Sequence, residues 1–514
     1  MRRAALAAVL LALAVAVSAR ALTRPDPAAQ AVLDGCGRDD TAAISNLVPE
    51  WAYVGDANAP ASLPPPPPQW LEGVVDAIGS QAELAVHTSG GDIPTTHRSY
   101  DLNVDVRPDP PYEALMGGDP VARTGNFAAG GDEVGRMHTE LEERAIPTFA
   151  WPEPGDRVRM LGSWVWDCGH WLPGGERTEI HPFRALWLLR NPAGRVAPRS
   201  ATGESEGDLF VTTTKTGAGK VADCAHETKG DRQALKACIA AEPDWQDVAG
   251  SYRFFLPAPP RPSRAARLRF RVVDGGSTAD APPLRLSPRA DGTFVSVDVP
   301  ASLIAGGRPL ALAKRVLAGW TPLPARARPV HLRVRFTRLL VRRAMDPACP
   351  AGQPTCKDVA ESTNLGQISA LPGEWNVYSD VAGIWSLWRP STLLVRRDGQ
   401  MFRVDHSFDV YLPRGRPWRV LVWTRECDYG SFGGEGTTQP LSPCPKTGEF
   451  GVRAGDDVPG MAVAHFRSPS AAVGVHALSS RLDGSTCPRQ NRHGCYQVTF
   501  SVQPVRMQKT SRRH

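Results

Sequence analysis

Residues 155–182 read GDRVRMLGSWVWDCGHWLPGGERTEIHP, and this stretch decides the fold. Its first half alternates apolar and polar side chains, as expected for a half-buried strand, with Gly162 placed for a β-bulge. Pro182 favours an extended backbone at the residue before it. A glycine-rich loop at residues 173–175 lets the chain reverse between the two halves. The stretch therefore predicts two strands joined as a hairpin.

Four residues of this hairpin carry candidate chemistry. Glu179 and His181 are two positions apart, so on a strand their side chains leave the same face. Asp167 and His170 lie in the turn, and the chain reversal brings them toward the other pair. Carboxylates with imidazoles suit zinc, manganese or iron. All four are therefore candidate ligands of a divalent metal such as zinc, with Glu179 and Asp167 as candidate catalytic carboxylates.

The same stretch supports two interpretations besides a metal or catalytic site: a structural ion pair and carbohydrate binding. The sequence alone does not decide among the three. A carboxylate beside a histidine is often a buried ion pair that ties a strand to a loop. Three tryptophans of the stretch are candidate ligand-binding residues for a carbohydrate: Trp164, Trp166 and Trp171. A second group of titratable residues lies upstream, and nothing in the sequence fixes its distance from the first: His97, Asp101, Asp105, His138, Glu140 and Glu142.

The N-terminus predicts export. Arg2 and Arg3 precede an apolar segment at residues 4–17, which is followed by small residues suited to cleavage. This is the pattern of a secretory signal peptide and favours a secreted or periplasmic location. No later stretch approaches the roughly 18 apolar residues of a transmembrane helix, so we expect no transmembrane segment.

The ten cysteines of an exported chain predict disulfides, because the compartment is oxidising. Eight of them form close sequence pairs, which leaves the first two to each other. Thiolate zinc sites are not favoured, since C-x-x-C spacing is absent. The candidates are Cys36 with Cys168, Cys224 with Cys238, Cys349 with Cys356, Cys427 with Cys444, and Cys487 with Cys495.

At 514 residues the chain exceeds one ordinary core, and 48 glycines with 48 prolines favour turns and short strands. We predict a mainly β protein of two domains, an N-terminal β-barrel or sandwich with a short helix and a C-terminal β-sandwich. Apolar spacing also suggests a short helix at residues 70–78. The predicted segments are a signal peptide at 1–21, an N-terminal arm with a proline-rich linker at 22–69, a β-rich domain carrying the cluster at 70–262, a sandwich-like domain at 263–508 and a basic tail at 509–514.

One resemblance supports the barrel. Trp164–His170 has the form Trp-Val-x-Asp-x-x-His and is followed by Glu179–Pro182, which reads Glu-Ile-His-Pro. The combination resembles a motif of uncharacterised exported bacterial proteins and covers residues 95–190. It implies a small β-barrel or sandwich module similar to an oligonucleotide/oligosaccharide-binding barrel. It implies no established activity, so no catalytic role carries over.

We expect a cell-envelope or extracellular binding or structural module. A net charge of +6 is small for this length, so nucleic acid is not an expected partner; an envelope polymer or glycan is a candidate partner. Strand arginines such as Arg333 and Arg335 are candidates for a basic face. Common hydrolase and nucleotide-binding motifs are absent. Two alternatives stay open: a metal-dependent hydrolase using Asp167, His170, Glu179 and His181, and a carbohydrate-binding protein.

Overall fold

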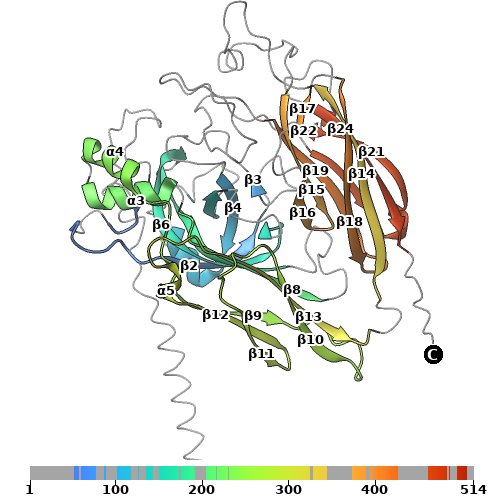
Figure 1. Cartoon of the computed structure of the whole chain (residues 1–514), viewed down its shortest axis with the longest axis horizontal. Coiled ribbons are helices and arrows are strands. Elements are labelled where there is room, and N and C mark those ends of the chain that lie inside the picture. Colours follow the sequence, from blue (N-terminus) through green and yellow to red (C-terminus); the bar gives the residue numbers. More distant parts are fainter. Residues whose placement is uncertain are drawn as a thin grey trace, which may run out of the picture.

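The structure is a computed structural model of the chain, shown in Figure 1. The predicted signal peptide and basic tail lie outside the residues that it describes. Those residues are 51–56, 60–76, 86–87, 101–116, 126, 135–142, 150–172, 175–190, 204–215, 217–229, 231–323, 328–343, 373–388, 394–396, 399–426, 461–482, 485–486 and 495–505.

A ten-stranded sheet dominates the N-terminal half, and part of it closes into a barrel. The order β6-β2-β4-β5-β7 returns to its start because β7 also pairs with β6. β5 and β7 run parallel, and the other pairs of the ring are antiparallel. This confirms the predicted N-terminal barrel. Its strands are β2 (Gln69–Val75), β4 (Asp101–Pro108), β5 (Met137–Glu142), β6 (Arg157–Leu172) and β7 (Gly175–Leu189).

Further strands extend the sheet from both sides of the ring. The short β1 (Trp51–Tyr53) pairs with β6, and β3 (Val86–His87) pairs with β4. On the other side the order runs from β7 to β8 (Ser205–Thr212), β13 (Ala311–Thr321) and β10 (Arg267–Asp274). A separate three-stranded sheet packs on this extension and contains β9 (Gly250–Pro257), β11 (Arg285–Arg289) and β12 (Gly292–Val299).

Two sequence predictions fail in this half. Residues 70–78 do not begin a helix: β2 occupies Gln69–Val75, and its burial alternates because Leu71 and Val75 face the core. Nor is 22–69 simply an arm, because Trp51–Tyr53 is a buried strand of the main sheet. Helical and alternating patterns overlap in so short an apolar segment.

Two helices cover one side of the barrel, α3 (Gly217–Thr228) and α4 (Arg232–Ala241). The side chain of Asp231 caps α4 by accepting the backbone N–H of Ala234. The predicted disulfide between Cys224 and Cys238 joins the two helices. Cys495 is also disulfide-bonded, while the side chains of the other seven cysteines lie outside the described residues.

The C-terminal half is the predicted β-sandwich (Figure 1). Its two sheets enclose a core of aromatic and branched side chains. One sheet has the order β18-β14-β24-β21, made of β14 (Val330–Arg343), β18 (Met401–Leu412), β21 (Gly474–Ser479) and β24 (Cys495–Pro504). The other contains β15 (Gly373–Val381), β16 (Ile384–Leu387), β17 (Leu394–Arg396), β19 (Trp418–Glu426), β20 (Met461–Phe466), β22 (Arg481–Leu482) and β23 (Ser485–Thr486).

The division between the two sets of sheets falls between β13 and β14 and does not coincide with the predicted boundary at 262 and 263. Strand pairing crosses that point, since β9 pairs with β12 and β8 pairs with β13. The prolines at 257–262 stand at the end of β9, where the chain turns toward β10. Proline lacks the N–H that a sheet ladder needs, so it marks strand ends as readily as domain linkers.

Candidate functional site

The candidate site lies on the outer wall of the barrel, opposite its apolar interior. Side chains alternate between the faces of a strand. Val104 and Val106 of β4 and Ile180 of β7 belong to the interior core. Their neighbours Asp105, Glu179 and His181 therefore point outward. By the same alternation Met137 of β5 faces inward, and the next residue on the outer wall is His138.

The predicted hairpin positions half of this site. β6 and β7 are antiparallel, with Val165 opposite Glu179 and Asp167 opposite Arg177. The register shifts on both sides of Gly162, which confirms the predicted bulge. A Cβ there would lie 2.5 Å from Cγ2 of Ile180, so the close approach of the strands requires glycine.

The second group of titratable residues supplies the other half. β5 lies between β4 and β7, placing His138 opposite Asp105 on one side and Glu179 on the other. His138 contacts Asp105 through Nδ1 at 3.0 Å and Glu140 through Nε2 at 2.5 Å. Nδ1 of His181 lies 3.1 Å from a carboxylate oxygen of Glu140 and 3.1 Å from one of Glu179. All five side chains are at least 95% buried.

Strand β1 closes the cluster from the side. The indole Nε1 of Trp51 donates a hydrogen bond of 2.7 Å to Oε1 of Glu179, and the Trp51 ring meets the His181 ring edge-on at 5.5 Å. The other oxygen of Glu179, Oε2, is buried without a hydrogen-bond partner among the described residues. A buried carboxylate oxygen without a partner costs about 1–3 kcal/mol or more, so this position favours an additional ligand.

The electrostatics of the cluster are those of crowded negative charges. Burial and the charge of Arg177 act to lower the pKa of His138, but Asp105 and Glu140 outweigh them and raise that pKa well above its ordinary value. Burial favours a higher pKa for Glu140, yet His181 and His138 hold it well below the usual range. For Glu179, burial and the neighbouring carboxylates of Asp167 and Glu140 raise the pKa. Another positive charge here would relieve the repulsion between carboxylates.

The structure separates the four sequence-predicted residues. Glu179 and His181 lie in the cluster, as described above. Asp167 is buried on the same wall, but its carboxylate accepts a 2.8 Å bond from Nε of Arg177. The side chain of His170 lies outside the described residues. Among the described side chains, His138 and Glu140 accompany Glu179 and His181, and the predicted set of four ligands stays a prediction.

Two tryptophans of the predicted carbohydrate-binding set have described side chains, and neither faces solvent. Trp164 and Trp166 are buried in the barrel core, and Nε1 of Trp164 donates to the backbone oxygen of Leu115. Their positions follow from the alternation, which turns both indoles inward while Asp167 turns outward. The side chain of Trp171 lies outside the described residues.

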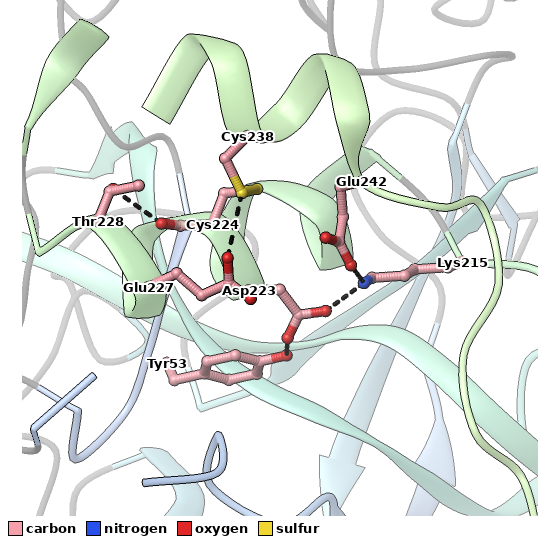
Figure 2. Close-up of a disulfide and its surroundings, with 8 residues drawn as sticks. All are labelled: Tyr53, Lys215, Asp223, Cys224, Glu227, Thr228, Cys238 and Glu242. Atoms are coloured by element: carbon pink, nitrogen blue, oxygen red, sulfur yellow. Dashed lines mark hydrogen bonds and ion pairs between the residues drawn. A yellow bond between two sulfur atoms is a disulfide. The ribbon is translucent and has the colours of Figure 1, made fainter. Parts of the chain in front are cut away.

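A second polar cluster lies between α3 and β1, close to the disulfide (Figure 2). Tyr53 donates a hydrogen bond of 2.6 Å to Asp223, and Lys215 bridges Asp223 to Glu242. Burial, followed by the charge of Asp223, raises the pKa of Tyr53 well above its ordinary value. Although Glu242 lies near Cys224 and Cys238, the two sulfurs are bonded to each other, and Lys215 forms ion pairs with both Asp223 and Glu242. This arrangement is structural and fixes the helices to the sheet.

No family model and no curated protein matches the sequence. Among solved structures, a single C2 domain of a plant Extended Synaptotagmin 1 is similar over 35% of this chain and 98% of its own, with 9% identity and a TM-score of 0.19. The structure of Extended-Synaptotagmin 2 that contains its SMP domain and two C2 domains is similar over 84% of this chain and 89% of its own, with 9% identity and a TM-score of 0.17. At these scores the likeness does not extend to function. In the described residues, no helix is long and apolar enough to cross a membrane.

Proposed function

We propose that this protein is an exported binding protein that holds one divalent transition-metal ion on the outer wall of its barrel. His138, Glu140 and Glu179 are the ligands, with His181 as the fourth. One observation carries the proposal: ligand atoms from the first three residues lie within 4.8 Å of one another, and all three side chains are buried.

The spacing of the donor atoms supports tetrahedral coordination. Nδ1 of His181 is 3.1 Å from an oxygen of Glu140 and 3.1 Å from an oxygen of Glu179. A tetrahedral zinc ion with bonds near 2.0–2.1 Å places neighbouring ligand atoms roughly 3.3 Å apart. The two contacts of His181 therefore need to lengthen by only about 0.2 Å to admit the ion, whereas the 2.5 Å contact between His138 and Glu140 has to open by about 0.8 Å. Nitrogen with oxygen donors suits zinc or manganese.

Burial favours binding over hydrolysis. Catalytic zinc sites keep a coordination position open to water or substrate, whereas structural sites are closed. Each of the four proposed ligands is almost completely buried. A hydrolase that used Asp167 would also have to release that carboxylate from Arg177. The ion would instead neutralise the crowded carboxylates and hold β5 against β7.

Elemental analysis tests the proposal. We expect about one zinc or manganese ion per chain, removed by a strong chelator and regained on soaking. Glu179→Gln and His138→Gln should each lose the ion, because each substitution replaces a strong metal ligand with the weakly coordinating side-chain amide of glutamine. The matched control is His226→Gln, since His226 is also a buried histidine paired with a carboxylate, that of Asp56, away from this cluster.

Thermal unfolding provides a second readout. A ligand that binds only the folded state stabilises it, by about 2.7 kcal/mol at a concentration of 100 times Kd. Added zinc should therefore raise the Tm of the apo protein and of His226→Gln, but not that of Glu179→Gln. A protein that contains no stoichiometric metal and regains none on soaking would contradict the proposal. So would full metal content in both cluster variants.

A further inference from the structure

The small sheet β9-β12-β11 has one face in the core and one face outside. Tyr252, Phe254 and Leu256 of β9 pack inward, together with the valines of β12. The intervening residues of all three strands therefore form one outer surface, which we call the arginine–phenylalanine face. Strand register places these residues side by side: Arg253, Phe255, Phe294, Arg285, Ser287 and Arg289.

Aromatic rings and guanidinium groups are in contact on this face. The rings of Phe255 and Phe294 lie 5.2 Å apart, centroid to centroid, and both are partly exposed. The guanidinium carbon of Arg253 stands 4.0 Å from the centroid of Phe294, and that of Arg289 stands 5.9 Å from it. Stacking on the ring limits the freedom of an arginine while leaving N–H groups available to a ligand.

The charge of this face lacks compensation. Three arginines lie on it, Arg253, Arg285 and Arg289, whereas the outward residues of β12 include a single acid, Asp298. The net charge of these four side chains is therefore +2. Arg285 pairs with Asp298. Neither Arg253 nor Arg289 has an acidic partner within 4.0 Å among the described residues, although both side chains are exposed.

The arginines first suspected from sequence differ in this respect. On the outer face of the sandwich, Arg333 binds Asp409 through two nitrogens, and Arg335 binds Asp405. Those guanidinium groups already have carboxylate partners from the neighbouring strand β18. The two pairs of exposed arginines thus differ mainly in their partners. Arg333 and Arg335 are bound to aspartates of the chain, whereas, among the described residues, Arg253 and Arg289 are not.

We infer that the arginine–phenylalanine face binds an anionic polysaccharide. Arg253 and Arg289 would bind carboxylate or sulfate groups by charge-assisted hydrogen bonds, while Phe255 contacts the apolar C–H face of a sugar ring. Single-stranded nucleic acid fits less well, because it needs open ring faces on which bases stack. Arg253 already covers Phe294. The inference shares no residue with the metal site and does not rest on it.

Binding measurements on the full chain test the inference with heparin and polygalacturonate as probes. Both should bind, and neutral dextran should not. The double variant Arg253→Ala/Arg289→Ala should weaken binding about tenfold or more, because two charge-assisted contacts are lost. It should also make the affinity less dependent on salt concentration, since fewer ionic contacts form. Circular dichroism should show an unchanged fold.

The matched control is Arg333→Ala/Arg335→Ala, which removes the same charge from an exposed sheet face. It should change the affinity less than twofold. Equal weakening by both double variants would overturn the inference, since binding would then reflect net charge alone. Dextran binding as tight as that of polygalacturonate would overturn it too, as would tighter binding of a thymidine oligonucleotide than of either polysaccharide. Normal metal content in the Arg253→Ala/Arg289→Ala protein keeps this result separate from the metal proposal.

Discussion

Glu179 and Arg190 are both buried charged residues, but their surroundings act on them in opposite directions. Arg190 donates to Asp208 and Asp156, and these carboxylates raise its pKa despite the opposing effect of burial. Glu179 has neighbouring carboxylates on two sides, and its pKa rises with burial. The first arrangement is a compensated ion-pair network. The second retains an excess of negative charge, which is why the metal proposal falls on Glu179.

Tyr252 gives a prediction about alkaline pH. Its hydroxyl donates to the backbone oxygen of Val248, and burial raises its pKa to about 12. An unfolded tyrosine ionises near pH 10, so only the unfolded chain releases this proton between pH 10 and 12. The contribution of this proton to the free energy of unfolding is therefore fully present below pH 10 and is lost as the pH rises through 12. At pH 11.5 the loss should reach about 2 kcal/mol.

Urea unfolding at pH 9 and pH 11.5 measures this loss. Between pH 9 and pH 11.5, the free energy of unfolding of Tyr252→Phe should fall by about 2 kcal/mol less than that of the unmodified protein. Tyr411→Phe is the control, since Tyr411 is 45% exposed. An equal decrease in Tyr252→Phe and in the unmodified protein would rule out this residue as the cause.

At the scale of elements, local patterns identified much of the fold. Alternation of apolar and polar side chains predicted β6, and the glycine-rich loop after it predicted the reversal into β7. These signals are local, since each depends on residues within a few positions of one another. The segment after Gln69 was misjudged because Leu71 and Val75 fit a helical repeat as well as an alternating one.

The candidate site was only half visible for a related reason. Glu179 and His181 share a strand, so their spacing alone indicates a common face. His138 and Glu140 also share a strand, but they reach Glu179 through the parallel pairing of β5 with β7. That pairing joins segments about forty residues apart, and no local pattern specifies it. Trp51 is more distant still, at 128 residues from Glu179.

The disulfide should matter most for α4. α3 is held by Ala218, Val221 and Ala222 in a core with β1, whereas α4 is largely exposed. The bond closes a loop with a sequence separation of 14, for which chain entropy predicts about 3 kcal/mol. The double variant Cys224→Ser/Cys238→Ser should therefore lose about that stability.

Hydrogen–deuterium exchange locates the effect of this double variant. Amides of α4 should exchange faster, while those of α3 change less and those of β7 remain as in the unmodified protein. Metal content should stay the same, because the bond lies outside the proposed metal cluster. Unchanged exchange in α4 would show that packing alone holds this helix.

At the scale of the whole molecule, the barrel and the sandwich share a core. Trp151 precedes β6, and its ring lies 5.3 Å from that of Tyr378 in β15 and 6.5 Å from that of Trp423 in β19. Beside these rings, the buried guanidinium of Arg419 bonds to Asp380 of the sandwich and to Glu153 of the barrel segment. Contacts between the halves are thus apolar as well as ionic, and unfolding of one half should destabilise the other.

Calorimetry of Trp151→Ala tests that coupling. Removing a buried tryptophan costs about 3–5 kcal/mol, and here the lost contacts join the two halves. We expect the unmodified protein to unfold in one cooperative transition and Trp151→Ala to unfold in two. The control is Trp388→Ala, since Trp388 packs on Phe336 within the sandwich core. It should lower the temperature of a single transition because the contacts between the halves remain. The opposite result would be a single transition in Trp151→Ala, with its temperature lowered as in the control. Trp151 would then stabilise the core without coupling the unfolding of the barrel to that of the sandwich.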